Sequence, residues 1–580
     1  MSIIKNVVKL LGLFNKREKI NSAIMLALVM IGGFAETLGI GVVLPFATIL
    51  LDQNSVEKYP ILKTITEVPW IGGYRRFIVL MSVALVLIFV LKSLYMFFLI
   101  YIQNRFTLNR QIEMSKKMFQ SYIYRPYEFF FKKNTAELQR NIGLVTAIIS
   151  GVLMTGLQLL TELVSFIFIF VLLLLVDPIT SVSIVVVLSG IVALYYFVIK
   201  NKLEEIAKKQ NEHNLKMGKA ILEGMGGIKD VKVLGRERSF LRRYEQNSKE
   251  FAKTHAFFNL ASQSPRLLIE TIAISGLVII IVINALRNPD MSASLPTMAL
   301  FGMAAIKIMP AMNRIIGYVA TIRFNNVHFN TIYEDLLEVN KTDVPEEGTP
   351  DNKIQFDEKI EIKGVTYRYP GTTKTILEGV DLEIRKGDMI GIVGRSGGGK
   401  TTLVDIVLGL LKPEEGSILV DGFDIESDIR GWRRNIGYVP QNIFIVDDSV
   451  TANVALGVPE DDVDTGRVWD ALEIANLKEH IDSLEQKLDT NVGQSGVKLS
   501  GGQRQRLGIA RALYHDPSIL IFDEATSSLD NESERAITEA IARIGHSKTM
   551  LIIAHRLNTL EKCDVIYEVR DSKLQRAEYA

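Results

Sequence analysis

The sequence predicts a fold in two parts: an α-helical polytopic membrane domain with six spanning helices, fused to an α/β domain with a phosphate-binding loop. Up to about residue 340 the chain is apolar and contains six long hydrophobic runs. After residue 353, short apolar strands alternate with helical segments, a pattern typical of α/β domains. The mean hydropathy of +0.20 is high for a wholly soluble protein.

Six hydrophobic runs define the membrane domain. A bilayer span needs about 20 mostly apolar residues, and the runs satisfy this length. The third and fourth are joined only by Asp177-Pro178, which we expect to be a tight turn because proline interrupts a helix. The runs lie near residues 20–51, 77–103, 142–176, 178–199, 256–286 and 293–321.

The N-terminal segment is predicted to be an interfacial elbow helix. Ile3, Val7, Leu11 and Phe14 recur at helical spacing with lysines between them, which suits a helix lying on the cytoplasmic membrane surface. A soluble amphipathic helix is the alternative. We expect this elbow over 1–19, the transmembrane domain over 20–340, a polar Pro/Gly linker over 341–353 and the nucleotide-binding domain over 354–580.

The distribution of basic residues predicts the orientation. Segments 1–19, 104–140 and 200–256 hold 5, 8 and 14 Lys and Arg residues, and we expect them to be cytoplasmic. The opposite segments 52–76, 177–178 and 287–292 hold 4, 0 and 1. Both termini and the α/β domain are therefore predicted to lie in the cytoplasm.

The long connections have expected roles of their own. Segments 104–141 and 200–255 are polar with helical composition, and we expect paired helices that reach below the membrane. Their turns, near 125–138 and 223–237, are candidate docking surfaces for the α/β domain, the alternative being solvated loops. The outer segment 52–76 is long enough for a short surface helix.

Composition excludes other classes of function. The chain has 66 basic and 65 acidic residues, so its net charge of +1 does not suggest a nucleic-acid partner. Cys563 is the single cysteine, which rules out an intrachain disulfide and argues against a cysteine-based zinc site.

The glycine-rich segment after residue 393 is the strongest chemical signal. A buried-strand pattern over 389–393 leads into GRSGGGKTT, and an apolar helix follows. Glycines let backbone N–H groups close around phosphates, while the lysine neutralises the β- and γ-phosphates and a hydroxyl binds Mg²⁺. The expected ATP-binding residues here are Gly394, Ser396, Gly397, Gly399, Lys400, Thr401 and Thr402, with Thr401 as the Mg²⁺ ligand.

Two carboxylates follow a second buried strand, SILIFDE. We expect Asp523 to hold Mg²⁺, mainly through water, and Glu524 to act as the general base on the attacking water. A strand that ends in Asp-Glu is more often structural when it stands alone. The phosphate loop in the same chain favours the catalytic interpretation.

A second anion site is predicted at LSGGQ. Ser500, Gly501, Gly502 and Gln503 open a helix, and such a helix start attracts phosphate. One chain thus carries two phosphate-facing surfaces. A twofold dimer can place each opposite the phosphate loop of the other chain, so we expect a homodimer.

The motifs GRSGGGKTT, LSGGQRQR, ILIFDEATSSLD and IIAHRL, in this order, resemble those of ABC ATPases over residues 355–572. The resemblance implies that Gln441 is the Q-loop residue at Mg²⁺ or water and His555 the switch histidine at the γ-phosphate. It further implies that Tyr369 stacks on adenine and Asp530 lies at the dimer interface. Gln494 departs from the family, where TxVGExG carries an acid, so a salt bridge from this position is not expected.

Charged residues inside the apolar runs suggest a substrate site. A charge at mid-bilayer costs about 2.5–3.5 kcal/mol, so uncompensated cations are expected to face a wet cavity. Lys307 and Arg314 are two helical turns apart and share a face. The candidate residues for an anionic head group are Lys92, Arg266, Lys307 and Arg314.

The alternative is purely structural pairing. Arg266 and Glu270 are spaced i,i+4 and can pair with each other, and Glu36 or Glu162 can neutralise Lys92. Some runs also extend into the cytoplasm, where a charge costs little.

The domain order and four membrane segments resemble exporters of the PglK-type flippase family of bacterial protein N-glycosylation. The segments are FAETLGIGVVLPFATIL, IFVLKSLY, SPRLLIE and IKIMPAMNRIIGY. The resemblance implies ATP-driven flipping of a polyprenyl-diphosphate-linked oligosaccharide, from the cytoplasmic to the outer leaflet of the bacterial inner membrane. It also implies that segment 52–76 contacts the polyprenyl tail. Lys92 and Lys307 stand where the family has arginines. The alternative within the exporters is export of drugs, peptides or other lipids. A soluble ABC ATPase and an ATP-gated channel subunit are the alternative hypotheses from other classes of protein.

Overall fold

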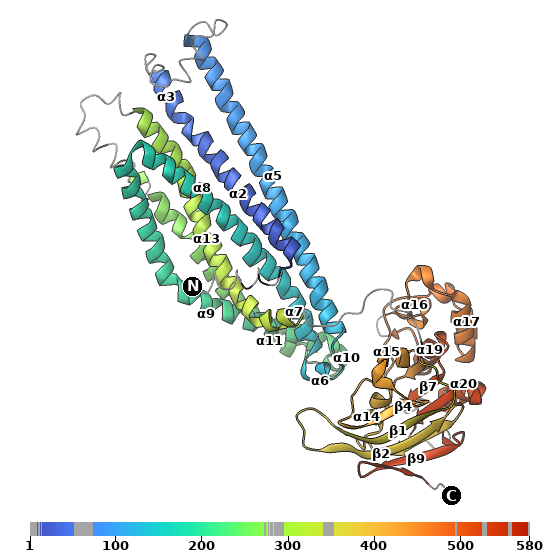
Figure 1. Cartoon of the computed structure of the whole chain (residues 1–580). Coiled ribbons are helices and arrows are strands. Elements are labelled where there is room, and N and C mark those ends of the chain that lie inside the picture. Colours follow the sequence, from blue (N-terminus) through green and yellow to red (C-terminus); the bar gives the residue numbers. More distant parts are fainter. Residues whose placement is uncertain are drawn as a thin grey trace. The chain divides into compact units, whose positions relative to one another are not determined.

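The computed structural model divides the chain into two compact units (Figure 1). The first comprises Met1–Arg125 and Asn134–Val344, and the second comprises Pro126–Lys133 and Pro345–Ala580. The structure describes residues 14–51, 74–271, 295–339, 353–493, 496–524, 531–554 and 560–577, with Lys9, Gly12 and four isolated residues between 274 and 282. The predicted elbow helix, outer helix and linker lie largely or wholly outside these ranges.

The first unit is built from long helices. Helix α2 (Lys16–Gly41) begins at a capping box, in which Asn15 and Glu18 exchange side-chain and backbone hydrogen bonds. Helix α3 (Val43–Leu51) continues it, and α5 spans Tyr74–Ile123. Tyr95 of α5 donates to the carbonyl of Leu28 at 2.6 Å, which ties α5 to α2.

The third hydrophobic run contains a change of helix type. Helix α7 (Thr135–Ile148) passes into a π-helical segment, η2 (Ile149–Met154), and then into α8 (Thr155–Val176). Within the π-helical segment, the absence of a side chain at Gly151 makes room for Asn325 of α13 (Leu295–Val339). A Cβ atom there would lie 2.3 Å from the Asn325 side chain.

The expected turn at Asp177-Pro178 is where α8 ends. Asp177 is extended, and Pro178 is the first residue of α9 (Pro178–Gly226). Proline suits the first helical position because that N–H group has no partner within the helix. Helix α9 packs against α11 (Glu237–Gln263), and the short helices α10 (Ile228–Val233) and α6 (Phe129–Lys132) lie in the predicted turns.

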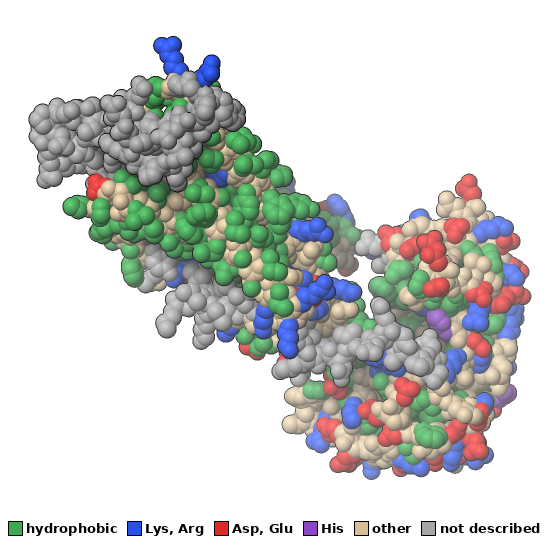
Figure 2. All heavy atoms as spheres, turned by 45° about the horizontal axis from the view of Figure 1, so that its top comes forward, with side chains coloured by type: hydrophobic (Ala, Val, Ile, Leu, Met, Phe, Trp, Pro, Cys, Tyr) green, Lys and Arg blue, Asp and Glu red, His purple; other side chains and the backbone are tan. Residues whose placement is uncertain are grey.

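Among the residues that the structure describes, three helical stretches are long and apolar enough to cross a membrane: Lys16–Leu50, Tyr74–Ile123 and Glu137–Val176. The predicted runs 178–199 and 293–321 lie in α9 and at the start of α13, while 256–286 falls partly outside the described residues. Figure 2 shows hydrophobic side chains crowding the visible face of this unit, whereas the second unit mixes acidic and basic side chains.

The second unit contains two sheets. The larger has the order β10-β9-β3-β8-β7-β6, in which β9 to β6 are parallel and β10 is antiparallel. The smaller sheet, β2-β1-β4-β5, is antiparallel. The strands are β1 Lys359–Arg368, β2 Thr375–Arg385, β3 Met389–Gly394, β4 Glu415–Val420, β5 Phe423–Asp424, β6 Ile436–Val439, β7 Ile519–Asp523, β8 Thr549–Ile553, β9 Val565–Arg570 and β10 Lys573–Arg576.

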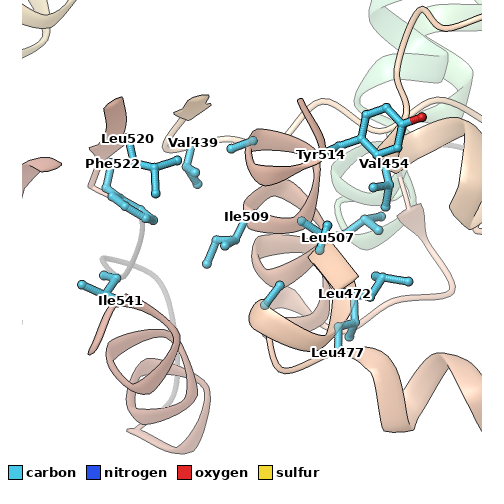
Figure 3. Close-up of a cluster of buried hydrophobic side chains, with 14 of the residues drawn as sticks. Val439, Val454, Leu472, Leu477, Leu507, Ile509, Tyr514, Leu520, Phe522 and Ile541 are labelled. Carbon is cyan, nitrogen blue, oxygen red and sulfur yellow. The ribbon is translucent and has the colours of Figure 1, made fainter. Parts of the chain in front are cut away.

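Helices cover both faces of the parallel sheet, and a hydrophobic core lies on each side. One core joins Phe522 and Leu520 of β7 to α19 and α20 (Figure 3). The other surrounds Trp432, whose indole N–H donates to the carbonyl of Val407 at 2.7 Å. The helices are α14 Lys400–Val407, α15 Ile429–Arg433, α16 Val450–Val454, α17 Thr465–Ile474, α18 Lys478–Asp482, α19 Gly501–Tyr514 and α20 Asn531–Ile544.

Candidate functional site

The phosphate loop lies between β3 and α14 and depends on glycine geometry. Gly394, Gly397 and Gly399 have φ values of 146°, 75° and 108°, in a region that L side chains rarely adopt. A Cβ atom on Gly394 would lie 2.6 Å from the carbonyl oxygen of Val569 on the neighbouring strand β9. The loop can therefore present its backbone N–H groups only with glycine at these positions.

Lys400 begins α14 at the end of this loop, and its side chain is buried. Its ammonium group donates to the carbonyls of Gly394 at 2.9 Å and Arg395 at 3.2 Å. It also lies 3.9 Å from the Glu524 carboxylate. The loop thus holds the cation in place with its own carbonyl oxygens, while Thr401, one residue further on, is exposed.

Strand β7 positions the two acidic residues Asp523 and Glu524. Every residue of β7 is buried, and Asp523 ends it. Glu524 follows with a φ of 50°, uncommon for a residue other than glycine. This backbone bend brings its carboxylate to the side-chain amide of Gln441, which donates to it at 2.7 Å. Lys400, Gln441 and Glu524 are therefore assembled as one cluster.

Asp523 lies in a buried and acidic environment. Burial and the neighbouring Glu524 charge raise the pKa of its carboxyl group, although Tyr438 donates to it at 3.4 Å. Asp405 of α14 is also buried, and desolvation together with Asp523 raises its pKa to about 6. Asp405 and Asp523 thus place two buried carboxyl groups close enough to affect each other's ionisation.

No group of three His, Cys, Asp or Glu side chains with metal-binding geometry occurs among the described residues.

The LSGGQ segment opens α19 with a capping box. Gln503 N–H donates to the Ser500 hydroxyl at 3.2 Å, and Ser500 N–H donates to the Gln503 side chain at 2.8 Å. Ser500 is exposed, so its hydroxyl and the first N–H groups of the helix can be reached from outside the unit.

Tyr369 lies beside the first turn of α14. Its hydroxyl is 3.0 Å from the Thr402 hydroxyl, and its ring makes an edge contact with Tyr367 at 5.3 Å between centroids. Phe131, which belongs to the same compact unit, contacts Tyr369 at 5.6 Å. His555, Asp530 and Gln494 lie outside the described residues, so the structure does not place them.

In the first unit, the four candidate substrate cations have acidic neighbours. Lys307 donates to Glu36 at 3.0 Å, and Lys92 lies 4.0 Å from the same carboxylate oxygen. Arg314 forms a bidentate pair with Glu162 at 2.6 and 3.0 Å. Arg266 pairs with Glu270 at 2.7 Å, as the structural alternative expects.

Sequence reasoning missed some of these neighbours. The pairings of Glu36 with Lys307 and of Glu162 with Arg314 join residues 271 and 152 positions apart, which no local spacing signals. Asp405 and Tyr438 were missed because a buried acid in a helix and a strand tyrosine carry no motif of their own.

The chain matches two family models. The transmembrane region of ABC transporters matches residues 22–263, and the ABC transporter ATPase model matches residues 377–527. A bacterial Atm1-family ABC exporter with ATP bound has the same fold, with a TM-score of 0.75, 21% identity and coverage of 97% of this chain and 96% of that one.

Relatives extend the match over most of the sequence. The ATP-dependent lipid A-core flippase of Dechloromonas aromatica (strain RCB) is 30% identical over 484 residues, covering 83% of this chain and 81% of the relative. The lipid A-core flippase of Pseudomonas aeruginosa is 44% identical over 241 residues, covering 41% of this chain and 38% of the relative.

The chain therefore belongs to the ABC transporters, as a half-transporter that joins an exporter-type transmembrane domain to one ATPase domain. It is embedded in the membrane, binds ATP and couples ATP hydrolysis to transport. The predicted fold class is confirmed.

Proposed function

We propose that this half-transporter flips a phosphorylated glycolipid across the bacterial inner membrane, and that the cargo is a polyprenyl-diphosphate-linked oligosaccharide. The observation that carries the proposal is the charge around Glu36. Two ammonium groups, Lys92 and Lys307, share this one carboxylate, which leaves an excess of one positive charge within apolar helices. Arg314 and Arg266 add further guanidinium groups, each with its own acid.

An anionic head group suits this arrangement because it compensates the excess charge. Leaving that charge unpaired among apolar helices is costly, so a passing phosphate gains more there than in water. A dimer of two chains doubles the number of these charged groups. Lysine ammonium groups act as point charges, whereas an arginine guanidinium group can bind a phosphate through two parallel hydrogen bonds. We therefore expect the site to select its ligand by negative charge more than by the orientation of the phosphate.

Lipid A-core transport is the second candidate. It is favoured by the relatives, whose names describe lipid A-core flippases. Both candidate cargoes carry phosphate and sugar on a hydrophobic anchor, and the proposed cation cluster serves either. Drugs and peptides lack this combination.

In the ATPase unit we propose that the phosphate loop, Lys400 and Thr402 hold the nucleotide phosphates and that Tyr369 stacks on adenine. Thr401, Gln441 and Asp523 would hold Mg²⁺, which bridges and neutralises phosphate oxygens when bound. Glu524 orients and deprotonates the attacking water, and its contact with Gln441 fixes the carboxylate. His555, Asp530 and the segment Ser500–Gln503 complete the site, the last from the partner chain of a homodimer.

The orientation follows the distribution of basic residues, with the ATPase unit and both termini in the cytoplasm. We propose the domain limits given above, including the elbow helix over 1–19 and the linker over 341–353.

The test is ATP-dependent translocation by the purified full-length protein in proteoliposomes. A polyprenyl-diphosphate glycan, a lipid A-core glycolipid and an apolar drug are compared at equal concentration. We expect the polyprenyl-linked glycan to move fastest and the drug not to move. Faster movement of the lipid A-core glycolipid would assign the second function, and movement of the drug alone would reject both.

A further inference from the structure

The chain on both sides of Gln441 lies directly against α19, the helix that begins at the LSGGQ segment. Gly437 of β6 precedes Gln441, and a Cβ atom on Gly437 would lie 2.5 Å from the carbonyl oxygen of Ala512 in α19. Ile443 follows Gln441 and packs on Gly508 of α19, where a Cβ atom would lie 2.4 Å from the Ile443 side chain. Glycine therefore permits a close approach to α19 before and after Gln441.

Arg511, in the last turn of α19, fixes the chain after Gln441 through hydrogen bonds. Its guanidinium group donates to the carbonyl of Phe444 at 2.6 Å. It also donates to the carbonyl of Asn453 in α16 at 2.7 Å and to the side-chain oxygen of Asn453 at 3.2 Å. Hydrogen bonds from a charged donor are stronger than those between neutral groups. Arg511 thus joins α19 and α16 to the chain just after Gln441.

Asn453 holds the same segment two residues further along. Its side chain is fully buried, and its oxygen accepts from the N–H group of Val446 at 3.0 Å. Its side-chain nitrogen donates to the carbonyls of Val446 and Ser449, both at 3.0 Å. The backbone at Phe444 and Val446 therefore has fixed partners on α19 and α16.

The surroundings of Arg511 indicate that it fixes backbone positions and does not neutralise an acid. Burial lowers the pKa of its guanidinium group. The three hydrogen bonds described for it all end on amide oxygens of Phe444 and Asn453. A buried charge is costly unless it is well bonded, and the planar fork of arginine can reach several oxygen atoms at once.

Gln441 is the residue on which this restraint acts. Its side-chain amide donates to the Glu524 carboxylate at 2.7 Å. Movement of the Phe444 backbone away from α19 would displace the Gln441 amide from that carboxylate. Displacement of a group in an active site by about 1 Å can slow a reaction about 100-fold.

We propose that Arg511 is a positioning residue for ATP hydrolysis. By holding the backbone of Phe444 against α19, it keeps the Gln441 amide at the Glu524 carboxylate. This inference rests on the proposed function, which gives Gln441 and Glu524 their roles at the nucleotide. Since α19 begins at Ser500, which that function assigns to the nucleotide of the partner chain, one helix then serves both ATP sites of the dimer.

The test measures phosphate release by the purified full-length protein in nanodiscs over a range of ATP concentrations. Arg511→Met keeps most of the length of the side chain and removes its donors. We expect kcat to fall about tenfold and the KM for ATP to change less than about twofold, because the phosphate loop and not Arg511 holds the nucleotide. Arg511→Lys keeps the charge but reaches fewer oxygen atoms, so its kcat should lie between those of Arg511→Met and the unmodified protein.

A double-mutant cycle shows whether Arg511 acts through Gln441. If it does, Arg511→Met has nothing further to displace once Gln441→Ala has removed the amide, so the double variant should have the kcat of Gln441→Ala alone. Independent effects multiply instead. A double variant that is slower than Gln441→Ala by the full effect of Arg511→Met would overturn the proposal.

Leu472→Ala is the control for a loss of stability alone. Leu472 of α17 is fully buried in the core between α17 and α19 (Figure 3), so its truncation lowers the unfolding temperature and leaves the hydrogen bonds of Arg511 in place. It should leave the kcat of the folded protein unchanged. An equal loss of kcat in Leu472→Ala and Arg511→Met would assign Arg511 a structural role only. If Arg511→Met does not fold, Arg511→Lys takes its place in the cycle.

The same measurements separate this inference from the roles proposed at the nucleotide. Full activity in Gln441→Ala would reject the role proposed for Gln441 and, with it, any action of Arg511 through that residue. Slow hydrolysis in Gln441→Ala together with full activity in Arg511→Met would reject the inference about Arg511 alone.

Discussion

At the scale of single residues, Glu524 is the group on which ATP turnover is expected to depend. Its left-handed backbone conformation turns the carboxylate toward Gln441 and Lys400. Glu524→Gln keeps the shape of the side chain and removes the base, so we expect ATP hydrolysis to fall by about 100-fold or more. Phosphate release measures turnover, and fluorescent nucleotide binding measures retained affinity.

Glu473→Gln is the matched control for this experiment, because Glu473 pairs with Lys478 on the surface of the same unit. It should leave turnover unchanged. Full activity in Glu524→Gln would remove Glu524 from the chemistry and leave it a structural role.

The raised pKa of Asp405 predicts that the stability of the ATPase unit depends on pH. Its pKa is raised to about 6 in the folded protein, from an ordinary 3.8. Between pH about 4 and 6 the folded state binds a proton that the unfolded state has released, so the free energy of unfolding falls as pH rises through this window and stays low above it. The difference between the folded and unfolded pKa values corresponds to about 3 kcal/mol in the free energy of unfolding.

Asp405→Asn should therefore raise the unfolding temperature at pH 8, measured without nucleotide or Mg²⁺, and flatten its dependence between pH 4 and 6. Asp461→Asn, at an exposed position on the surface of the same unit, should change neither. A lower unfolding temperature for Asp405→Asn at pH 8 would show that the charged carboxylate is stabilising.

At this scale a motif can be related to the backbone that it forms. Three glycines of GRSGGGKTT adopt positive φ values in the structure, a conformation that other residue types rarely adopt. The φ of Glu524 carries no such signal, since an acid after a strand is usually extended. Pairing of Arg314 with Glu162 depends on how two helices pack, which the order of residues does not express.

At the scale of elements, the π-helical segment Ile149–Met154 packs directly against α13. The extra residue in the turn is accommodated by Gly151 against Asn325, whose side chain donates to the carbonyl of Thr321 at 2.9 Å. Thr155 donates to the carbonyl of Ser150 at 3.0 Å and ties down the end of the wide turn. π-Helical turns are often found at functional positions.

Gly151→Ala should destabilise the first unit by about 1–3 kcal/mol because its methyl group overlaps Asn325. Thermal unfolding in nanodiscs measures the effect. Gly156→Ala is the matched control, since a Cβ atom at that position would meet nothing within 4 Å, and helix propensity alone should make it neutral or slightly stabilising. Equal stability of the two variants would mean that Asn325 moves aside freely.

Hydropathy predicts where the long apolar helices lie, but it does not predict where the helix type changes along them. The run 142–176 reads as one apolar helix, because the π-helical segment has the same composition as its neighbours. The Asp177-Pro178 junction was predictable, since proline leaves few backbone choices. The expected helical structure of the polar connections is also found, since α5 continues to Ile123 and α9 to Gly226.

At the scale of the whole molecule, the proposed homodimer places Ser500 of one chain opposite the phosphate loop of the other. In a Ser396→Cys/Ser500→Cys variant we expect ATP to promote an intermolecular disulfide, seen as a band of doubled mass without reductant. Burial raises the pKa of the Cys563 thiol to about 12, so the native cysteine is a poor competitor.

Ser396→Cys/Ser427→Cys serves as the control, because Ser427 is exposed on a different part of the same unit. It should stay monomeric on the gel, as should the first variant when Lys400→Ala is added. Crosslinking that is equally strong with and without ATP would contradict nucleotide-driven association.

The domain order and fold class were predictable because the two domains differ in their period of hydrophobicity. The cargo was not predictable in this way, because apolar side chains such as Phe89 and Met303 come to line one groove only when the helices pack together.

Trp432 gives the molecule an intrinsic optical reporter. The chain has three tryptophans, and this one is fully buried with its indole bonded to the last residue of α14, the helix that begins at Lys400. We expect nucleotide binding at Lys400 to shift α14 and change the surroundings of the indole ring, so that the emission spectrum of the unlabelled protein reports ATP binding.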